Sequence, residues 1–446
     1  MVKHYLEVVL KTESPLLVVQ KWDKTNYSTA LDYIPGSSIF GALMNQMIMN
    51  ETSSPYKIYT NGFISYMLKS EKNEQNISKY LNIVDIDYNE PELIVSDFTP
   101  CSKSFKRYTP PLMSIMKCRL IKEHYMDSTL YLLKKYANLY PSKFTKSLII
   151  TGTNISNLMD LYTPLICNDP NCSKSSIYPS ALKKSPRILP IESSEGKESV
   201  KIEKQSKVFI GTNPITKTTD KPKKSEEIDK GKLFTQEYIQ PNQLFKGFII
   251  FDDKKYSIDK IYKALKSMNI GGRKSSGFGK ISIQSENKTK TIDQLKETLK
   301  NKYIEIQNQL EKYLKMQQKC SIIPFFAYSH IPIKTLYQIK NELSNINPNS
   351  TVDIKFLNYK NTILKIRNQV INKWEYLDVI IRGSTGFIEI NSDIDDNTKN
   401  KIYDILTNYN LLLKGYYSYK GLGELEFYPE ILFKNINKIN FNISNY

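Results

Sequence analysis

The start of the chain alternates between apolar and polar positions. Leu6, Val8 and Leu10 lie at every second position, which is the period of a half-buried strand. After a loop, the sequence Ile34-Pro35-Gly36-Ser37-Ser38 precedes a helix with apolar residues at helical spacing: Ile39, Leu43, Met47 and Ile48. A serine hydroxyl can accept a hydrogen bond from the free N–H groups of a first helical turn, so Ser37 or Ser38 is expected to cap this helix.

The pattern is less regular between about residues 50 and 235 and becomes regular again afterwards. Residues 216–232 are rich in Lys, Thr and Asp with few apolar residues, which is typical of a mobile loop. A strand near residues 245–251 and a helix at 258–268 follow. The helix leads into residues 271–279, where four of nine residues are glycine. Glycines at this density indicate a sharply bent backbone that lies close to something else.

The end of the chain repeats this order of helix, glycine loop and strand. An apolar helical pattern at residues 402–409 precedes Gly421-Leu422-Gly423, which matches Gly277-Phe278-Gly279, and each is followed by an alternating strand. We interpret this as two copies of one βαββαβ unit in an α+β fold. A helix from Ile292 to Leu310 would connect them. The predicted domains are residues 1–290, with an insertion at about 90–232, a connecting helix at 291–320, and residues 321–446.

Positive charge exceeds negative charge throughout the chain. The 446 residues include 63 Lys and Arg against 45 Asp and Glu, a net charge of +18, which favours a polyanionic partner. A genome-wide bias toward Lys, Asn and Ile would also raise this number. The basic residues nevertheless form two local clusters: Lys103, Lys106, Arg107, Lys117, Arg119 and Lys122, and then Lys217, Lys221, Lys223 and Lys224.

No run of 18 apolar residues is present, and the first ten residues read as a strand rather than as a signal peptide. The five cysteines are irregularly spaced, which argues against a secreted disulfide framework. We therefore expect a cytoplasmic protein.

The glycine loop at residues 271–279 has the composition of a phosphate-backbone contact. Its glycines expose N–H donors, while Arg273 and Lys274 supply positive charge. The loop follows a helix and precedes a strand, the reverse of the order in nucleotide-binding glycine loops. The alternative is a flexible turn with no ligand.

These sequences together resemble the RAMP superfamily of CRISPR proteins. The resemblance rests on Ser14-Pro15-Leu16, Ile34 to Ser38 with Gly41-Ala42-Leu43, Phe245-Lys246-Gly247 and the glycine loop. It covers most of residues 1–285. The second half matches more weakly, through Gly383-Ser384 and residues 421–424. Residues 110–130 and a later cysteine pair favour the large two-domain RAMP subunit of type III-D effector complexes.

The resemblance implies ferredoxin-like (RRM-like) domains and a structural subunit that binds guide RNA (crRNA). It would hold the 5′ handle beside the large polymerase-like subunit and the backbone RAMP subunits, and would meet target RNA. The implied RNA contacts are Ser37, Ser38, Gly271, Gly272, Arg273, Lys274, Ser275, Ser276, Gly277 and Gly279.

Three cysteines and a histidine could hold structural zinc. Cys167 and Cys172 flank a four-residue turn, and Cys118 and His124 lie upstream, which together make a Cys3His set. The alternative is that these residues are unligated. Cys172 lies among polar residues, where a free cysteine is uncommon, and this favours zinc.

The residues give a weaker indication of catalysis. In the resembled family, backbone subunits cut target RNA with an Asp that precedes the Pro-Gly-Ser-Ser element, and Asp23 is the better candidate here than Asp32. None of the three histidines, His4, His124 and His330, is placed convincingly for proton transfer. We expect a non-catalytic subunit; the alternatives are a RAMP ribonuclease that cuts target or precursor RNA, and a general single-stranded RNA-binding protein.

The zinc site can be tested directly. Protein purified without added metal should contain about one zinc per chain. Cys167→Ser should lower both the zinc content and the thermal unfolding midpoint, because metal-binding energy in a structural site is folding energy. A metal-free protein whose stability is unchanged by the substitution would contradict the site.

Overall fold

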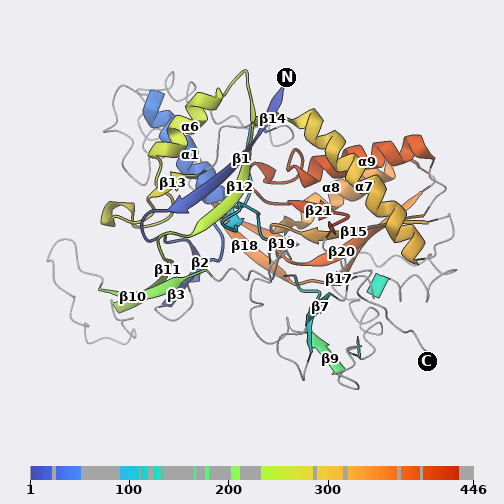
Figure 1. Cartoon of the computed structure of the whole chain (residues 1–446), viewed down its shortest axis with the longest axis horizontal. Helices are drawn as coiled ribbons and strands as arrows, with labels where there is room; N and C mark the ends of the chain where they lie inside the picture. The colour runs from blue at the N-terminus through green and yellow to red at the C-terminus, as the bar shows by residue number, and fades with distance from the viewer. Residues whose placement is uncertain are drawn as a thin grey trace. The chain divides into compact units, whose positions relative to one another are not determined.

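The structure of the chain is a computed structural model (Figure 1). It describes residues 2–22, 27–51, 91–110, 112–118, 125–127, 129, 132–133, 165–166, 176–179, 202–210, 233–284, 289–314, 320–348, 350–368, 373–391 and 395–430. The chain divides into two compact units. The first comprises Met1–Ile58, Val95–Tyr108 and Glu198–Thr289, and the second comprises Tyr59–Ile94, Thr109–Lys197 and Lys290–Tyr446.

The first unit is built on an antiparallel sheet in the order β13-β1-β12-β4. The predicted first strand is present as β1 (Lys3–Thr12) and pairs along its length with β12, with Leu6 opposite Ile249. The other strands of this sheet are β12 (Leu244–Asp252), β13 (Ile281–Ile283), β4 (Leu93–Val95), β5 (Thr99–Pro100) and β14 (Thr289–Thr291). Its helices are α1 (Gly36–Glu51) and α6 (Ile258–Ser267).

A smaller sheet of the first unit has the order β10-β11-β3-β2. Strands β10 (Lys204–Ile210) and β11 (Leu233–Ile239) form an antiparallel hairpin, and β11 pairs in parallel with β3 (Tyr27–Ala30), which in turn pairs with β2 (Val19–Trp22). The loop at residues 216–232, expected to be mobile, lies outside the described residues.

The second unit repeats the strand order of the first. Its main sheet has the order β17-β20-β15-β21, formed by β15 (Cys320–Ala327), β17 (Thr351–Asn358), β20 (Thr385–Asn391) and β21 (Leu425–Phe427). Helix α8 (Ile333–Ser344) precedes β17, and α9 (Asp396–Asn410) precedes β21. The predicted connecting helix is present as α7 (Ile292–Leu314), whose buried residues Tyr303, Ile306, Leu310 and Leu314 belong to the core of this unit.

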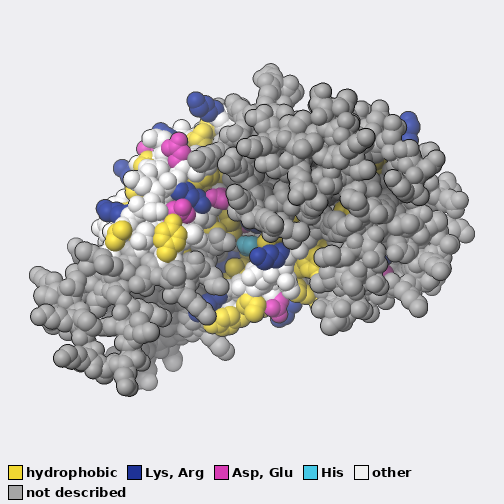
Figure 2. Space-filling view, turned by 90° about the horizontal axis from the view of Figure 1, so that it is seen from below, with side chains coloured by type: hydrophobic (Ala, Val, Ile, Leu, Met, Phe, Trp, Pro, Cys, Tyr) yellow, Lys and Arg dark blue, Asp and Glu magenta, His cyan; other side chains and the backbone are white. Residues whose placement is uncertain are grey.

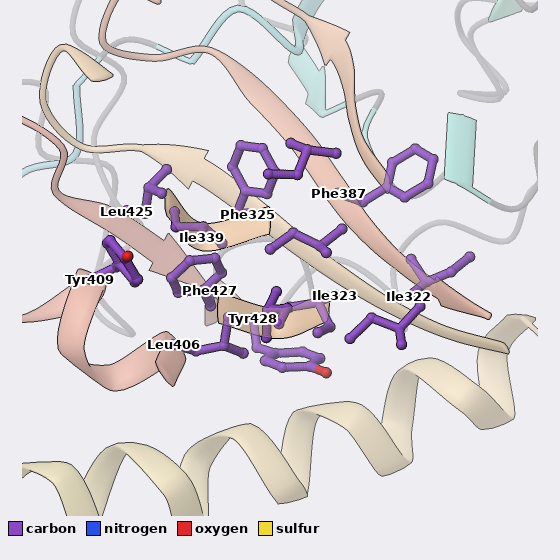
Figure 3. Packing of buried hydrophobic residues seen from close by; sticks show 14 of the residues in the cluster. Ile322, Ile323, Phe325, Ile339, Phe387, Leu406, Tyr409, Leu425, Phe427 and Tyr428 are labelled. Carbon is purple, nitrogen blue, oxygen red and sulfur yellow. The ribbon is translucent and has the colours of Figure 1, made fainter. Parts of the chain in front are cut away.

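The core of the second unit lies between its sheet and these helices. Figure 3 shows Phe325, Phe427 and Leu406 packing in one cluster of buried side chains. Two further sheets complete the described part of the unit. One contains β16 (Ile331–Pro332), β18 (Asn361–Asn368) and β19 (Lys373–Ile380); the other contains β6 (Ile115–Cys118), β7 (Tyr125–Asp127), β8 (Leu165–Ile166) and β9 (Ser176–Pro179).

Both main sheets are antiparallel with helices in the connections, so the predicted α+β class is confirmed. In each unit the four strands of the main path follow the chain order strand, helix, strand, strand, helix, strand. Among the residues described, no helix is both long and apolar enough to cross a membrane.

Each unit also carries a glycine loop of the same conformation before its last strand. In the first loop, residues 271–279, a short 3-10 helix (Lys274–Ser276) begins after Arg273 and ends at Gly277, both left-handed. In the second loop, residues 415–423, the 3-10 helix (Ser418–Lys420) is bounded in the same way by Tyr417 and Gly421. The two loops have the same backbone path although they share only their glycines.

Two glycines of the first loop provide a test of this geometry. Both have positive φ, 81° at Gly277 and 85° at Gly279. A Cβ at Gly277 would meet nothing within 4 Å, whereas one at Gly279 would lie 2.0 Å from the backbone oxygen of Ile270. Gly277→Ala should therefore lower the free energy of unfolding by about 1–2 kcal/mol, the cost of a left-handed Ala. Gly279→Ala should lower it by about 3 kcal/mol or more, because overpacking adds to that cost.

Urea unfolding of the two variants measures this difference. Equal stability of the two Ala variants would contradict the close approach at Gly279.

Candidate RNA-contact surface

The first glycine loop is fastened to the segment that follows β1. The N–H of Gly272 donates to the Leu17 carbonyl at 3.0 Å, and the N–H of Gly279 donates to the Pro15 carbonyl at 2.9 Å. A Cβ at Gly271 would lie 2.4 Å from the same Leu17 oxygen. The close approach that the glycines predicted is therefore an approach to the protein's own backbone at Gly271 and Gly279.

Arg273 fixes the loop to the smaller sheet. Its Nε donates to Oε1 of Gln236 on β11 at 2.7 Å, and its guanidinium lies 3.7 Å from the ring centroid of Phe209 on β10. Gln236 is only 3% exposed. Arg273 is thus half-buried. It positions the loop, because a buried hydrogen bond and a cation–π contact both hold it in place.

The exposed residues of the loop are Gly272 and the continuous segment Lys274, Ser275, Ser276 and Gly277. Neighbouring atoms partly desolvate the Lys274 ammonium group and lower its pKa, although the residue remains exposed to solvent. Lys207 on β10 is also exposed, and its Nζ lies 5.8 Å from the centroid of the same Phe209 ring that Arg273 contacts. We name Lys207 and residues 274–277 the loop surface. Its ammonium groups can bind phosphate oxygens without reading a base.

Phe209, Gln236 and Lys207 were not anticipated as parts of this surface. They lie on a hairpin far from the loop in sequence, and no local pattern links them to it. In the coloured part of the face in Figure 2, Lys and Arg side chains lie among apolar and acidic ones.

The two serines of the Pro-Gly-Ser-Ser element do not form the expected helix cap. Helix α1 begins at Gly36, whose N–H donates to Oδ1 of Asp97 at 2.8 Å. Asp97 is 2% exposed, and a carboxylate at a helix N-terminus satisfies a free N–H and interacts favourably with the helix dipole. Ser37 is exposed and Ser38 half-buried, and among described residues no hydrogen bond joins either to the glycine loop. The cap comes from a residue distant in sequence, which no local signal indicates.

The second glycine loop is buried. Tyr417, Ser418 and Tyr419 are all fully or almost fully enclosed. The Lys420 ammonium lies 5.1 Å and 5.2 Å from the ring centroids of Tyr417 and Tyr419, and burial lowers its pKa. The conformation is shared by both loops, but only the first presents an exposed cation among the residues compared.

The residues considered for metal binding or catalysis are mostly not described. Asp23, His124, Cys167 and Cys172 lie outside the described residues, and Cys118 is the last residue of β6. Strand β9 pairs with both β6 and β8, which places Cys118 and the residue before Cys167 in one small sheet. No group of three metal-ligating side chains occurs in the part of the chain that the structure describes.

The remaining candidates are engaged in contacts within the protein. Asp32 lies 2.5 Å from Nζ of Lys204, and Nε2 of His4 lies 3.4 Å from Oδ2 of Asp253. His330 accepts a hydrogen bond at Nδ1 from the N–H of Arg382, and burial lowers its pKa to about 4, with the Arg382 charge adding to the shift. A histidine with a pKa of about 4 is neutral near pH 7, and it is therefore a poor general acid at that pH.

Many solved structures are similar to the chain, including the following two. One is a chain of the type III-B Cmr-beta complex, determined by cryo-EM with cognate target RNA and AMPPnP bound; it is 12% identical over 85% of this chain and 86% of that chain, with a TM-score of 0.35. The other is Cmr6 from Pyrococcus furiosus, 12% identical over 63% of this chain and 97% of that chain, with a TM-score of 0.24. Scores this low support no inference about fold or function. No curated protein matches the chain at a significant level.

The match to a protein family is more decisive. The RAMP superfamily matches residues 9–282, which include the end of β1, the Pro-Gly-Ser-Ser element, the β10–β11 hairpin and the first glycine loop. More than half of the chain is covered, and the matched region contains the complete loop surface. The chain therefore belongs to the RAMP superfamily.

Proposed function

We propose that this protein is a guide-RNA-binding structural subunit of a type III CRISPR effector complex. The observation that carries the proposal is the loop surface, where Lys207 and Lys274 are exposed beside a turn that Arg273 holds in place. Membership of the RAMP superfamily and the net charge of +18 agree with an RNA partner.

The type of complex follows from sequence resemblance. The Pro-Gly-Ser-Ser element, the glycine loop and the residues near Cys118 resemble the large two-domain subunit of type III-D complexes. In such a complex the chain would hold the 5′ handle of the guide RNA and bind both the large polymerase-like subunit and the backbone RAMP subunits. Target RNA would meet the same assembly.

Both units fit a ferredoxin-like domain. Each main sheet places its first strand between the third and fourth, with the second strand at the far edge: β13-β1-β12-β4 and β17-β20-β15-β21. A helix follows the first strand and another precedes the fourth in each unit. This is the arrangement of a βαββαβ unit with long insertions between its second and third strands, and it supports duplication of one domain.

A structural zinc site in the insertion is part of the proposal. Cys118 ends β6, and Cys167 directly follows β8, in the sheet where β9 joins these two strands. Two thiolates supplied from one small sheet, with His124 and Cys172 nearby in sequence, would suit tetrahedral zinc. The role of the metal would be to hold the insertion together, because small sheets bury little apolar surface.

The loop surface would bind the RNA backbone rather than bases. Lysine ammonium groups contact phosphates irrespective of sequence, so they set the path and orientation of the strand. We infer that Arg273 contributes by positioning the loop, because its Nε donates to Gln236 and its guanidinium lies against the Phe209 ring. It is a positioning residue for Lys274.

The contribution of the two lysines can be measured on the purified chain. Lys207→Ala combined with Lys274→Ala should weaken binding to guide RNA. The combined change should also reduce the slope of log affinity against log salt by up to about one for each lysine, because each phosphate contact releases counterions. Fluorescence anisotropy with labelled guide RNA over a range of salt concentrations gives both quantities.

The matched control replaces Lys263 and Lys266 with Ala. Both lysines are exposed on α6, so the change in net charge is the same while the loop surface is intact. If the two double variants lose equal affinity, only overall charge is at work and the loop surface has no special role.

A further inference from the structure

A short hairpin turn of the first unit, residues 102–106, carries an exposed aromatic side chain. The N–H of Phe105 donates to the Ser102 carbonyl at 2.9 Å, and the N–H of Ser102 donates to the Lys106 carbonyl at 3.0 Å, so three residues form the loop. The Ser102 hydroxyl additionally accepts from the Lys106 N–H at 3.1 Å. Phe105 is 38% exposed, whereas most phenylalanines of the chain are buried. We name these five residues the Phe105 turn.

Phe105 occupies a position where glycine is the usual residue. In three-residue hairpin loops the third residue adopts the left-handed conformation, which glycine enters without steric cost. Phe105 has a φ of 60°. A bulky side chain in this region is uncommon and costs conformational free energy, and this side chain is nevertheless partly exposed rather than enclosed in the core. An exposed aromatic kept at a strained position indicates that its ring has a use.

The charges of the turn indicate which ligand the ring would meet. Lys103 and Lys106 are exposed on either side of Phe105, and the sequence contains no acidic residue from Phe98 to Lys122. A flat ring between two cations suits a nucleobase with a phosphate on each side. Base stacking on an aromatic ring together with lysine contacts is the usual way to bind single-stranded nucleic acid.

The turn is attached to the Pro-Gly-Ser-Ser element through Asp97. Nη2 of Arg107 donates to the Asp97 carbonyl at 2.7 Å, while the Asp97 carboxylate caps α1. The Tyr108 N–H donates to the Pro100 carbonyl at 3.0 Å, and the backbones of Cys101 and Arg107 form an isolated antiparallel β-bridge. The ring of Phe105 is therefore presented by a backbone that is anchored on both sides, which lowers the entropy lost when a base stacks on it.

We propose that the Phe105 turn is a second RNA-contact site, at which an unpaired base stacks on Phe105 while Lys103 and Lys106 bind the adjacent phosphates. The proposal rests on the proposed function in requiring that the chain bind RNA, but it concerns a site separate from the loop surface. The chemical class of ligand is single-stranded RNA.

The test uses the full chain and a short fluorescein-labelled single-stranded RNA. Phe105→Gly should raise the dissociation constant about fivefold or more, as expected when one base loses its aromatic partner. The same variant should unfold at an unchanged or higher temperature, because glycine relieves the left-handed strain. Phe105→Trp should retain the wild-type affinity, whereas Phe105→Leu, which is apolar without a π-face, should lose it.

Tyr337→Ala is the matched control, since Tyr337 is an aromatic residue that is 48% exposed on α8 of the second unit. It should leave the dissociation constant unchanged. Crosslinking with 4-thiouridine-labelled RNA should modify Phe105 in the wild-type chain.

Several outcomes would overturn the proposal. If Phe105→Gly binds RNA with wild-type affinity, the Phe105 turn is not an RNA-contact site. If Lys207→Ala combined with Lys274→Ala still weakens binding in that case, the proposed function stands without this site. Phe105→Gly that binds RNA normally but no longer copurifies with other effector subunits would identify a protein contact. If Phe105→Gly keeps its affinity for RNA but loses binding to phosphatidylcholine–phosphatidylserine vesicles, the Phe105 turn is a membrane contact instead. A wild-type chain that binds no RNA would reject both proposals.

Discussion

The hydrogen bond from the Gly279 N–H to the Pro15 carbonyl closes the first glycine loop onto the segment that leaves β1. It depends on the absence of a side chain at Gly279, where a Cβ would collide with the Ile270 backbone. In this closed loop, Arg273 contacts Gln236 and Phe209 on the β10–β11 hairpin. The proposed phosphate contact of Lys274 depends on this closure, because the closed loop positions the Lys274 backbone, whereas Lys207 lies on β10.

The second glycine loop is closed by corresponding hydrogen bonds within its own unit, but its side chains are buried. The Gly423 N–H donates to the His330 carbonyl, and the Glu424 N–H donates to the Ser329 hydroxyl, as the Lys280 N–H does to Ser14. Corresponding hydrogen bonds therefore support a loop whose tyrosine side chains are enclosed in the protein, where the first loop has exposed cations. The two loops share a backbone conformation but differ in exposure, since the conformation depends on glycines and hydrogen bonds, and exposure depends on what covers the loop.

Asp97 links two features of the first unit that are far apart in sequence. Its carboxylate accepts from the first N–H of α1, and its carbonyl accepts from Arg107 beside the Phe105 turn. A buried carboxylate is costly unless it is hydrogen-bonded, and the helix N-terminus supplies both a donor and a favourable dipole. The start of α1 and the base of the turn are thereby held together by one residue that exposes almost none of its surface.

The sequence by itself determined the elements with a local physical signal. The alternation around Leu6 predicts β1, the three-to-four-residue spacing from Ile292 to Leu310 predicts α7, and the repeated Gly-apolar-Gly pattern predicts two loops of one kind, because periodicity and glycine content act over a few residues. Tertiary structure alone decided the contacts between distant residues. Asp97 in place of a serine caps α1, and Gln236 and Phe209 contact Arg273 across the smaller sheet. Such contacts depend on how sheets and loops pack, and packing brings together residues that share no sequence pattern.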